Sequence, residues 1–344
     1  MEIARYQIQK TYPNRKEQQM PTTKIAFIGA GDISLLHAEA IKNCPSAELA
    51  GIWSIDPELN EEKSKRYGCR IYESAESLVA DQEVDAVFIL TNLETHTQYA
   101  SLAMKAGKHV LIEKPVAPSI EELETLKACA KENKVILCPG HNYIHETSLH
   151  RTKELIDSGK IGKLVTIYIH YHIHHPEEVA RRYPGVIRHI LTHHSYILLY
   201  LAGKEHSPKS ISAMKTVVHY DSFQGEDLAL INLRLQSGAL AHFCADFAAD
   251  DHSGDPWTFS VKVIGTEGAT RFSYRDWVEN KPGVVHSHTF SAYEWHIREE
   301  VRHFVEECIQ KGTLPLSTID DAITAQKIIE ACEASIAQKR EVKI

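Results

Sequence analysis

Histidines gather in one stretch of the sequence, where their spacing could do chemistry. Seven of the 21 histidines fall within 25 residues. His170, His172 and His174 alternate, and alternate residues of a strand point to one face. His189 and His193 are four residues apart, which places them on one face of a helix. Such groups either converge on a divalent metal or form a polar pocket with one catalytic histidine. We favour the pocket without a metal, because no acidic or cysteine ligand spacing supports a metal site.

A glycine-rich turn stands near the start of the chain. The segment Gly29–Ser34, GAGDIS, follows an apolar run and precedes a stretch with helical spacing. Two glycines allow a tight turn and a close approach of backbone N–H groups to a pyrophosphate, at the positive end of the next helix. A turn without a ligand is the alternative, but the strand–turn–helix setting favours dinucleotide binding. The predicted cofactor contacts here are Gly29, Gly31, Asp32 and Ile33.

A single lysine occupies a second place where chemistry is expected. Lys114 follows the apolar run His109–Ile112, and Pro115 comes directly after it. The carboxyl ends of parallel strands are where open α/β sheets bind their ligands. An ammonium held there can stabilise negative charge on a reacting oxygen. This placement favours a catalytic lysine over a surface lysine at a strand end.

The elements that must position these residues alternate through the first half of the chain. Short apolar runs are separated by amphipathic stretches, a pattern typical of a parallel sheet covered by helices on both faces. The expected strands are Lys24–Ile28, Leu49–Ser54, Ala86–Leu90, His109–Ile112 and Lys134–Leu137. The expected helices include Leu35–Ile41, Thr95–Ala106 and Ile120–Asn133. Residues 21–142 are therefore predicted to form a Rossmann domain, preceded by a mobile extension over residues 1–20.

The second half reads differently, with long strands and few helices between them. Its runs are rich in β-branched and aromatic residues, which predicts an α+β domain over residues 143–344 with a large, mostly antiparallel open sheet. The expected strands are Leu164–His175, Ile211–Tyr220, Leu228–Leu235, Leu240–Ala248 and Phe259–Ile264. Helices are expected at Ile144–Ser158, Trp295–Gln310 and Ile319–Gln338, the last two packing back onto the Rossmann domain.

Composition narrows the class of protein. The 344 residues include 38 basic and 46 acidic residues, a net charge of -8 that argues against a nucleic-acid or anionic-membrane surface. No apolar run approaches the roughly 20 residues that span a bilayer. The seven cysteines form no C-x-x-C pair, which indicates buried thiols rather than zinc or disulfides and fits a cytoplasmic protein.

Three segments carry a family resemblance. AGKHVLIEKP, ending at Pro115, resembles the most specific motif of the Gfo/Idh/MocA family, the glucose–fructose oxidoreductase and inositol dehydrogenase group. Thr91 and His96 fit the family's T-P-N-x-x-H segment, although Asn92 and Leu93 replace its Pro and Asn. Gly-His-Asn, ending at Asn142, fits a G-x-N segment. The resemblance extends from Lys24 to the end of the chain.

The resemblance implies an NAD(P)-dependent oxidoreductase that moves hydride to or from a secondary alcohol of a sugar, amino sugar or cyclitol. It implies a homo-dimer or homo-tetramer formed through the open sheet, and it puts Lys114 beside the nicotinamide ribose and the reacting hydroxyl. Further cofactor contacts are expected at Ser54, Thr91, Asn92, His96, Glu113 and Lys114. Substrate contacts are expected at Asn142, His170, His172 and His189.

One signature of the family has changed in this chain. Aligned with the D-x-G-x-H helix motif, His193 takes the histidine position, His189 takes that of the aspartate and Leu191 that of the glycine. His193 is a suitable general base, since an unperturbed imidazole has a pKa of about 6.5. His189 can orient the substrate, but it supplies no fixed negative charge.

The adenosine ribose is expected beside Ser54, at the end of the second strand. An acid at this position would repel the 2′-phosphate of NADP, and Ser54 does not. This leans the prediction slightly to NADP, although Asp56 is close enough to act as a substitute acid and Ile55 supplies no guanidinium.

Two other functions remain open from the sequence. A redox-neutral enzyme could keep NAD bound, oxidise one sugar carbon transiently and cleave a glycoside by β-elimination. A non-catalytic dinucleotide sensor is the third reading, and the presence of both Lys114 and His193 argues against it.

Overall fold

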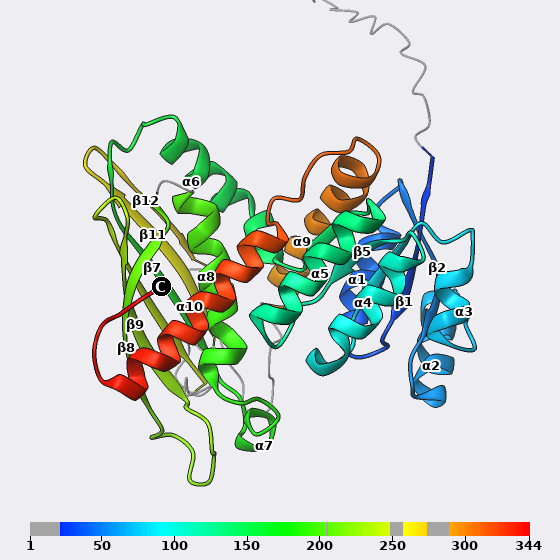
Figure 1. Cartoon of the computed structure of the whole chain (residues 1–344), viewed down its shortest axis with the longest axis horizontal. Helices are drawn as coiled ribbons and strands as arrows, with labels where there is room; N and C mark the ends of the chain where they lie inside the picture. Colours follow the sequence, from blue (N-terminus) through cyan, green and yellow to red (C-terminus); the bar gives the residue numbers. More distant parts are fainter. Residues whose placement is uncertain (1–20, 204–205, 248–256, 274–288) are drawn as a thin grey trace, which may run out of the picture.

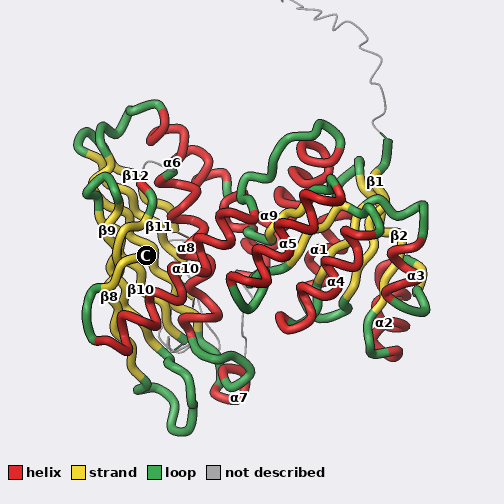
Figure 2. Tube along the Cα trace, viewed as in Figure 1, coloured by secondary structure: helices red, strands yellow, loops and turns green. Residues whose placement is uncertain are grey.

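The computed structural model describes residues 21–203, 206–247, 257–273 and 289–344. The extension predicted over residues 1–20 lies outside these ranges. Within them, the chain forms two sheets that lie side by side, with helices between them (Figures 1 and 2). No helix among these residues is long and apolar enough to cross a membrane. All seven cysteines are free thiols, and six of them are buried.

The first sheet has six parallel strands in the order β3-β2-β1-β4-β5-β6, which confirms the predicted Rossmann fold. Its strands are β1 (Thr23–Ile28), β2 (Ala47–Trp53), β3 (Arg70–Ile71), β4 (Ala86–Ile89), β5 (His109–Ile112) and β6 (Leu137–Pro139). Its helices are α1 (Ile33–Lys42), α2 (Pro57–Tyr67), α3 (Ala75–Ala80), α4 (His96–Lys105) and α5 (Ile120–Asn133), with a 3₁₀ turn η1 (Leu93–Thr95) before α4.

Local signals explain most of these boundaries. Asp56 caps α2 by accepting from Leu59 N at 3.1 Å, with Pro57 at the first helical position. The last strand of this sheet was expected at Lys134–Leu137, but β6 begins three residues later and covers Leu137–Pro139. Lys134 adopts a left-handed conformation with φ +55° and ends α5, so that pairing with β5 begins only at Leu137.

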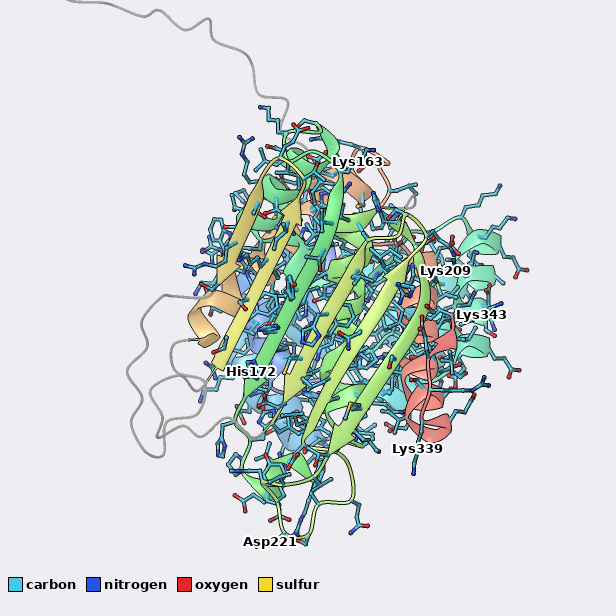
Figure 3. All side chains as sticks on the ribbon, turned by 90° about the vertical axis from the view of Figure 1, so that its left-hand side faces the viewer. Lys163, His172, Lys209, Asp221, Lys339 and Lys343 are labelled. Carbon is cyan, nitrogen blue, oxygen red and sulfur yellow. The ribbon has the colours of Figure 1, made fainter. Side chains whose placement is uncertain are left out.

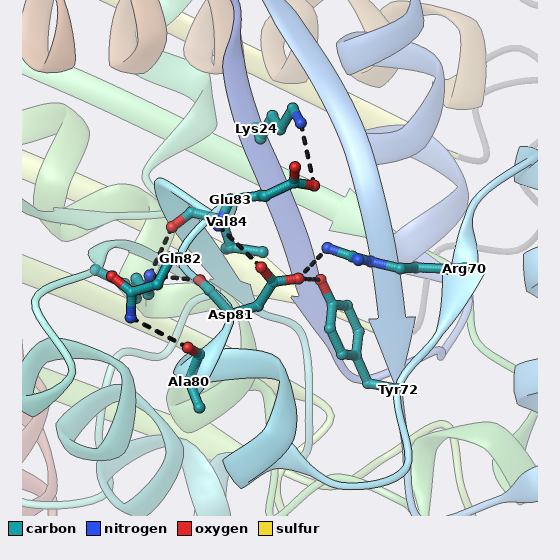
Figure 4. A network of polar contacts seen from close by, with 9 residues as sticks. Lys24, Arg70, Tyr72, Ala80, Asp81, Gln82, Glu83 and Val84 are labelled. Carbon is teal, nitrogen blue, oxygen red and sulfur yellow. Dashed lines mark hydrogen bonds and ion pairs between the residues drawn. The ribbon is translucent and has the colours of Figure 1, made fainter.

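A polar network fixes the loop that enters β4 (Figure 4). Asp81 accepts a hydrogen bond from the Tyr72 hydroxyl at 2.8 Å and pairs with Arg70. Lys108, just before β5, donates to the carbonyl oxygens of Asp81 and Val84, both at 2.7 Å. These contacts hold the amino ends of the central strands, and the carboxyl ends are left for ligands.

The second sheet is mixed rather than purely antiparallel. Its order is β12-β11-β7-β10-β9-β8-β13, and only the β7–β10 pair is parallel among the pairings described. The strands are β7 (Leu164–Ile173), β8 (Pro208–Thr216), β9 (Leu228–Leu235), β10 (Leu240–Asp246), β11 (Trp257–Gly265), β12 (Ala269–Ser273) and β13 (Val342–Lys343). The 3₁₀ turn η2 (Asn142–His145) and the helices α6 (Thr147–Asp157), α7 (Glu177–Ala180) and α8 (Val186–Ala202) precede or interrupt the strands.

The last two helices return to the first sheet, as expected. Helix α9 (Thr289–Arg302), continued by a π-helical stretch His303–Ile309, packs on α1. Its Val301 and the following Phe304 lie in the core cluster that contains Phe27 of β1. Helix α10 (Ile319–Gln338) contacts both α5 and α8, so it bridges the two sheets (Figure 1).

Among the described residues, helices cover one face of the second sheet and leave the other open. Ile167, Ile169 and Tyr171 of β7 are buried in the core cluster with residues of α8, while the alternating residues between them point the other way. Figure 3 looks onto this open face, with His172 labelled on it.

Candidate active site

The glycine-rich turn joins β1 to α1 at the carboxyl end of the first sheet. Gly29 has φ +110°, and a Cβ at this position would lie 2.5 Å from the carbonyl carbon and oxygen of Leu90. A Cβ on Gly31 would meet nothing within 4 Å. The first glycine is therefore required by the close approach of the turn to β4, and the second leaves the outer side of the turn open.

Ser34 stands where the dinucleotide-binding pattern G-x-G-x-x-G/A has a glycine or an alanine. Ser34 is fully buried, and its hydroxyl lies 2.8 Å from the hydroxyl of Tyr67 at the end of α2. Asp32 and Ile33 begin α1, and the side chain of Asp32 makes no capping hydrogen bond. The N–H groups of Ser34 and Leu35 donate to the carbonyl oxygens of Gly31 and Asp32 at 3.0 and 3.2 Å, which leaves the N–H of Ile33 available to an anionic group at the turn.

The expected ribose edge is occupied by two hydrogen-bonded side chains. The Ser54 hydroxyl donates to the carbonyl oxygen of Asp56 at 3.1 Å. The Asp56 carboxylate is held as the cap of α2 and does not swing freely toward a ribose. Ile55 between them is 85% exposed, and its apolar side chain offers neither a guanidinium nor an ammonium group.

His96 holds together two loops at the carboxyl ends of β4 and β5. Its Nε2 lies 3.0 Å from the carbonyl oxygen of Thr91, and its Nδ1 lies 3.0 Å from that of Pro115. Burial lowers the pKa of His96, although both carbonyl contacts oppose this, so the ring is neutral near pH 7 and its single N–H donates to one of the two carbonyls. Both ring nitrogens face these backbone carbonyls, which indicates that His96 shapes the cofactor site through its loops.

Glu113 points away from the pocket. One of its carboxylate oxygens lies 2.8 Å from Nε2 of His37 on α1, and the other accepts from the backbone N–H of Lys114 at 3.1 Å. Burial alone would raise the pKa of Glu113, but the contact with His37 and the charge of Lys114 lower it below the ordinary value. Glu113 thus ties α1 to the lysine loop instead of offering a free oxygen to a ligand.

Lys114 lines a cavity of about 510 Å³ between the two sheets. Burial lowers the pKa of its ammonium below the ordinary 10.5, although the charge of Glu113 opposes this. Five of the predicted site residues line the same cavity: Thr91, Asn92, His96, Lys114 and His189. The cavity therefore joins the lysine of the first sheet to the histidine helix of the second half.

His189 faces Lys114 across this cavity. Its ring lies 3.7 Å from that of Tyr183, measured between centroids and at an angle of 30°. Burial, and after it the positive charge of Lys114, lowers the pKa of His189 well below the ordinary value. At neutral pH the residue is therefore an uncharged hydrogen-bonding group, in the position where the resemblance expects an aspartate.

His193 lies one turn further along α8 and is 2% exposed. Its Nδ1 lies 2.7 Å from the Tyr196 hydroxyl, which donates to Oδ1 of Asn142 at 3.2 Å. The same hydroxyl oxygen accepts from the backbone N–H of Tyr143 at 3.3 Å. Because the Tyr196 proton goes to Asn142, the His193 proton resides on Nδ1 and points at Tyr196. Nε2, which bonds to no described residue, then carries the lone pair.

Two neighbours complete this chain of contacts. The Nδ2 group of Asn142 is buried and has no hydrogen-bond partner among the described residues, so this donor of the amide is left unused. His141 stacks on the Tyr196 ring with 4.2 Å between centroids, and burial lowers the pKa of His141 to about 3. Burial, with Lys114 as the next cause, also lowers the pKa of His193 well below the ordinary value.

His170 and His172 do not reach the pocket, and their prediction as substrate contacts is wrong. They alternate with core residues of β7 and point to the open face of the sheet, whereas α8 covers the other face. The β7 residue that faces His193 is Tyr171, whose ring centroid is 5.7 Å away. The sheet therefore separates the two histidine groups, and they cannot share a metal ion.

Sequence reasoning missed Tyr196. It stands three residues after His193, a spacing that places both side chains on one face of a helix. Tyr183, which stacks on His189, had no sequence signal of its own because its position depends on the loop after α7.

These features fit a dinucleotide. The glycine turn leaves its outer side open, the N–H of Ile33 at the start of α1 has no hydrogen-bond partner among the described residues, and the cavity opens at the carboxyl ends of β4 and β5. The fold and the site thus define the class of protein, a Rossmann-type, dinucleotide-dependent oxidoreductase.

Comparison with known proteins identifies the family. A model described as an oxidoreductase family with an NAD-binding Rossmann fold matches residues 23–141, and one for the GFO/IDH/MocA C-terminal domain matches residues 149–271. The chain belongs to the Gfo/Idh/MocA family of oxidoreductases.

Three relatives illustrate the similarity. Inositol 2-dehydrogenase of Rhizobium meliloti is 24% identical over 343 residues, covering 94% of this chain and 99% of the relative. UDP-N-acetylglucosamine 3-dehydrogenase of Acidithiobacillus ferrooxidans is 37% identical over 118 residues, 34% of this chain and 36% of that enzyme. The structure of Lactobacillus casei scyllo-inositol dehydrogenase with NAD(H) and scyllo-inositol has a TM-score of 0.80 and 20% identity, covering 94% of this chain and 98% of that one.

Proposed function

We propose that this protein transfers hydride between a nicotinamide cofactor and a secondary alcohol of a sugar, amino sugar or cyclitol. The observation that carries the proposal is the meeting of Lys114 and His189 in one cavity, with His193 buried one helical turn behind His189. Relatives named as inositol and sugar-nucleotide dehydrogenases support the choice of substrate class.

In this proposal His193 is the general base. Its Nδ1 proton is held by Tyr196, so Nε2 can accept the proton of a substrate hydroxyl. The imidazolium that forms is stabilised by the polarised hydroxyl of Tyr196 and, through it, by Asn142. No carboxylate takes part in this chain of three side chains, which is where the site differs from the family's Asp–His pattern.

Lys114 stabilises the negative charge that develops on the substrate oxygen. Partial burial makes this charge–charge interaction stronger than it would be in water. His189, neutral and held against Tyr183, orients the substrate by hydrogen bonding. When bound, the nicotinamide cofactor supplies the acceptor or donor of the hydride.

The cofactor is held by the open side of the glycine turn, the α1 N-terminus and the loops that His96 joins. We keep the slight preference for NADP, because Ser54 adds no charge at the ribose edge and the Asp56 carboxylate is occupied as a helix cap. Asp56→Asn keeps the cap and removes a nearby negative charge. We expect kcat/KM for NADP to rise about fivefold relative to NAD, corresponding to about 1 kcal/mol of Coulomb energy. An unchanged ratio would contradict the placement of the ribose here.

A substrate panel tests the reaction. Purified protein is mixed with NAD or NADP and a set of sugars, amino sugars and cyclitols, and the absorbance of the reduced nicotinamide is followed while free sugar release from glycosides is assayed. Growth of the reduced band supports the dehydrogenase. Glycoside cleavage with a flat nicotinamide signal would instead support the redox-neutral reaction and overturn the proposal.

A further inference from the structure

A cluster of metal-binding side chains lies on the open face of the second sheet, away from the cavity. Strands β7 and β10 are the parallel pair at the centre of this sheet, with Cys244 opposite His170 and Asp246 opposite His172. A His-x-His pair on one strand thus faces a Cys-x-Asp pair on the next. All four side chains point to the same face, the one seen in Figure 3.

The ligand atoms of three of these residues are close together. A ring nitrogen of His172, Sγ of Cys244 and a carboxylate oxygen of Asp246 all lie within 4.8 Å of one another, and Nδ1 of His172 is paired with Asp246. Cys244 is 9% exposed and Asp246 is 6% exposed. Tetrahedral zinc places its ligand atoms about 3.5 Å apart, so small side-chain rotations would complete the coordination.

His170 supplies a second, independent observation. Its Nε2 is buried and has no hydrogen-bond partner among the described residues, although its ring lies 6.0 Å from that of His172 between centroids. A buried imidazole nitrogen without a partner is costly unless something binds it. His242 on the same face is not in this situation, since its Nδ1 lies 2.8 Å from Oδ1 of Asn232.

We propose that His172, Cys244 and Asp246, with His170 as the fourth ligand, form a binding site for a divalent transition metal of the zinc type. A thiolate and a carboxylate carry two negative charges and balance the charge of the ion, and two neutral imidazoles complete the set. Sulfur and nitrogen ligands favour zinc over magnesium or calcium, which take oxygen ligands. Four protein ligands would leave no open position, so the ion would join β7 to β10 and take no part in hydride transfer.

Metal content tests this site without any activity measurement, so its result is independent of the proposed reaction. The full-length chain, prepared without a polyhistidine tag, is stripped with a chelator, reduced, titrated with Zn²⁺ and analysed for bound metal. We expect about one tightly bound zinc per chain, with affinity falling at least tenfold in Cys244→Ser and in Asp246→Asn. Cys69→Ser and His242→Ala are the matched controls and should bind zinc as the unchanged chain does.

Cobalt gives a readout that needs no variant to fold. Co²⁺ added to the stripped protein should produce the near-ultraviolet charge-transfer band of a cobalt–thiolate bond, and Zn²⁺ should displace it. Absence of this band, or zinc binding that survives unchanged in Cys244→Ser, would overturn the proposal and leave only the His172–Asp246 ion pair.

Discussion

At the scale of single residues, the chain His193–Tyr196–Asn142 sets the protonation of the proposed base. The Tyr196 hydroxyl, at 2.7 Å, is the only hydrogen-bond partner of His193 Nδ1 among the described residues. In Tyr196→Phe the ring still packs but no longer fixes the tautomer or stabilises the imidazolium. We expect kcat to fall about 10- to 100-fold with KM changed little, because the lost interaction acts mainly in the transition state.

Tyr200→Phe is the control for this variant, since Tyr200 lies one turn further along α8. Steady-state kinetics on a substrate found in the panel give both constants. Equal effects of the two substitutions, or a change confined to KM, would show that Tyr196 is only a packing residue.

The pH profile of kcat/KM follows from two pKa shifts at the same scale. Burial lowers the pKa of His193 well below the ordinary value, so its basic form is already present where an unperturbed histidine would still be titrating, at about pH 6.5. Burial also lowers the pKa of Lys114 below 10.5, and the charged form is the one that stabilises the alkoxide. We expect no histidine-type rise near neutral pH, and a decline on the alkaline side at a pH below 10.5. A profile that rises through pH 6.5, or one that shows no decline up to pH 10.5, would contradict this.

At the scale of elements, the two glycines of the turn between β1 and α1 have different roles. Gly29 is needed for the fold, and Gly31 is expected to matter for cofactor binding. Gly29→Ala places a Cβ 2.5 Å from the backbone of Leu90 at φ +110° and should cost about 1–3 kcal/mol or more of stability. Gly31→Ala meets no protein atom within 4 Å, so its thermal unfolding midpoint should be nearly that of the unchanged chain.

A titration with the cofactor, measured through the quenching of protein fluorescence, completes this comparison. Gly31→Ala should weaken binding while the fold stays intact, because the new methyl group occupies the phosphate side of the turn. If Gly31→Ala binds NAD and NADP as the unchanged chain does, the dinucleotide does not lie on this turn.

Local sequence patterns were sufficient to predict most elements and the loops of the first sheet that line the cavity. Alternating apolar runs predict the parallel sheet, and the loops after its strands then place Gly29 against the backbone of Thr91, and Thr91 in one cavity with Lys114. The error at His170 and His172 has a different origin. Their spacing shows that they share a face, but the face that α8 covers is decided by packing between segments far apart in the sequence. The role proposed for Tyr196 rests on the contacts of its hydroxyl with His193 and Asn142, which the sequence alone does not show.

At the scale of the whole molecule, the open sheet face carries exposed apolar side chains that a monomer has little reason to keep. Met214 is 73% exposed, Leu240 48% and Leu230 39%. We expect a homo-dimer or homo-tetramer that uses this face. Leu240→Asp should lower the mass measured by light scattering after size-exclusion chromatography, and Ile55→Asp, in the exposed loop after β2, should not. A monomeric unchanged chain would contradict the expectation.

The central claim is that Lys114, which lines the cavity between the sheets, and His193, buried one helical turn behind His189, together carry out hydride transfer. The most direct test is the rate of nicotinamide reduction by the unchanged chain, Lys114→Met and His193→Ala, each first shown to be folded and to bind the cofactor. The account predicts at least a 100-fold lower rate in both variants, about 2.7 kcal/mol of lost transition-state stabilisation. Rates that stay within a few fold of the unchanged chain would place the chemistry elsewhere and contradict the account.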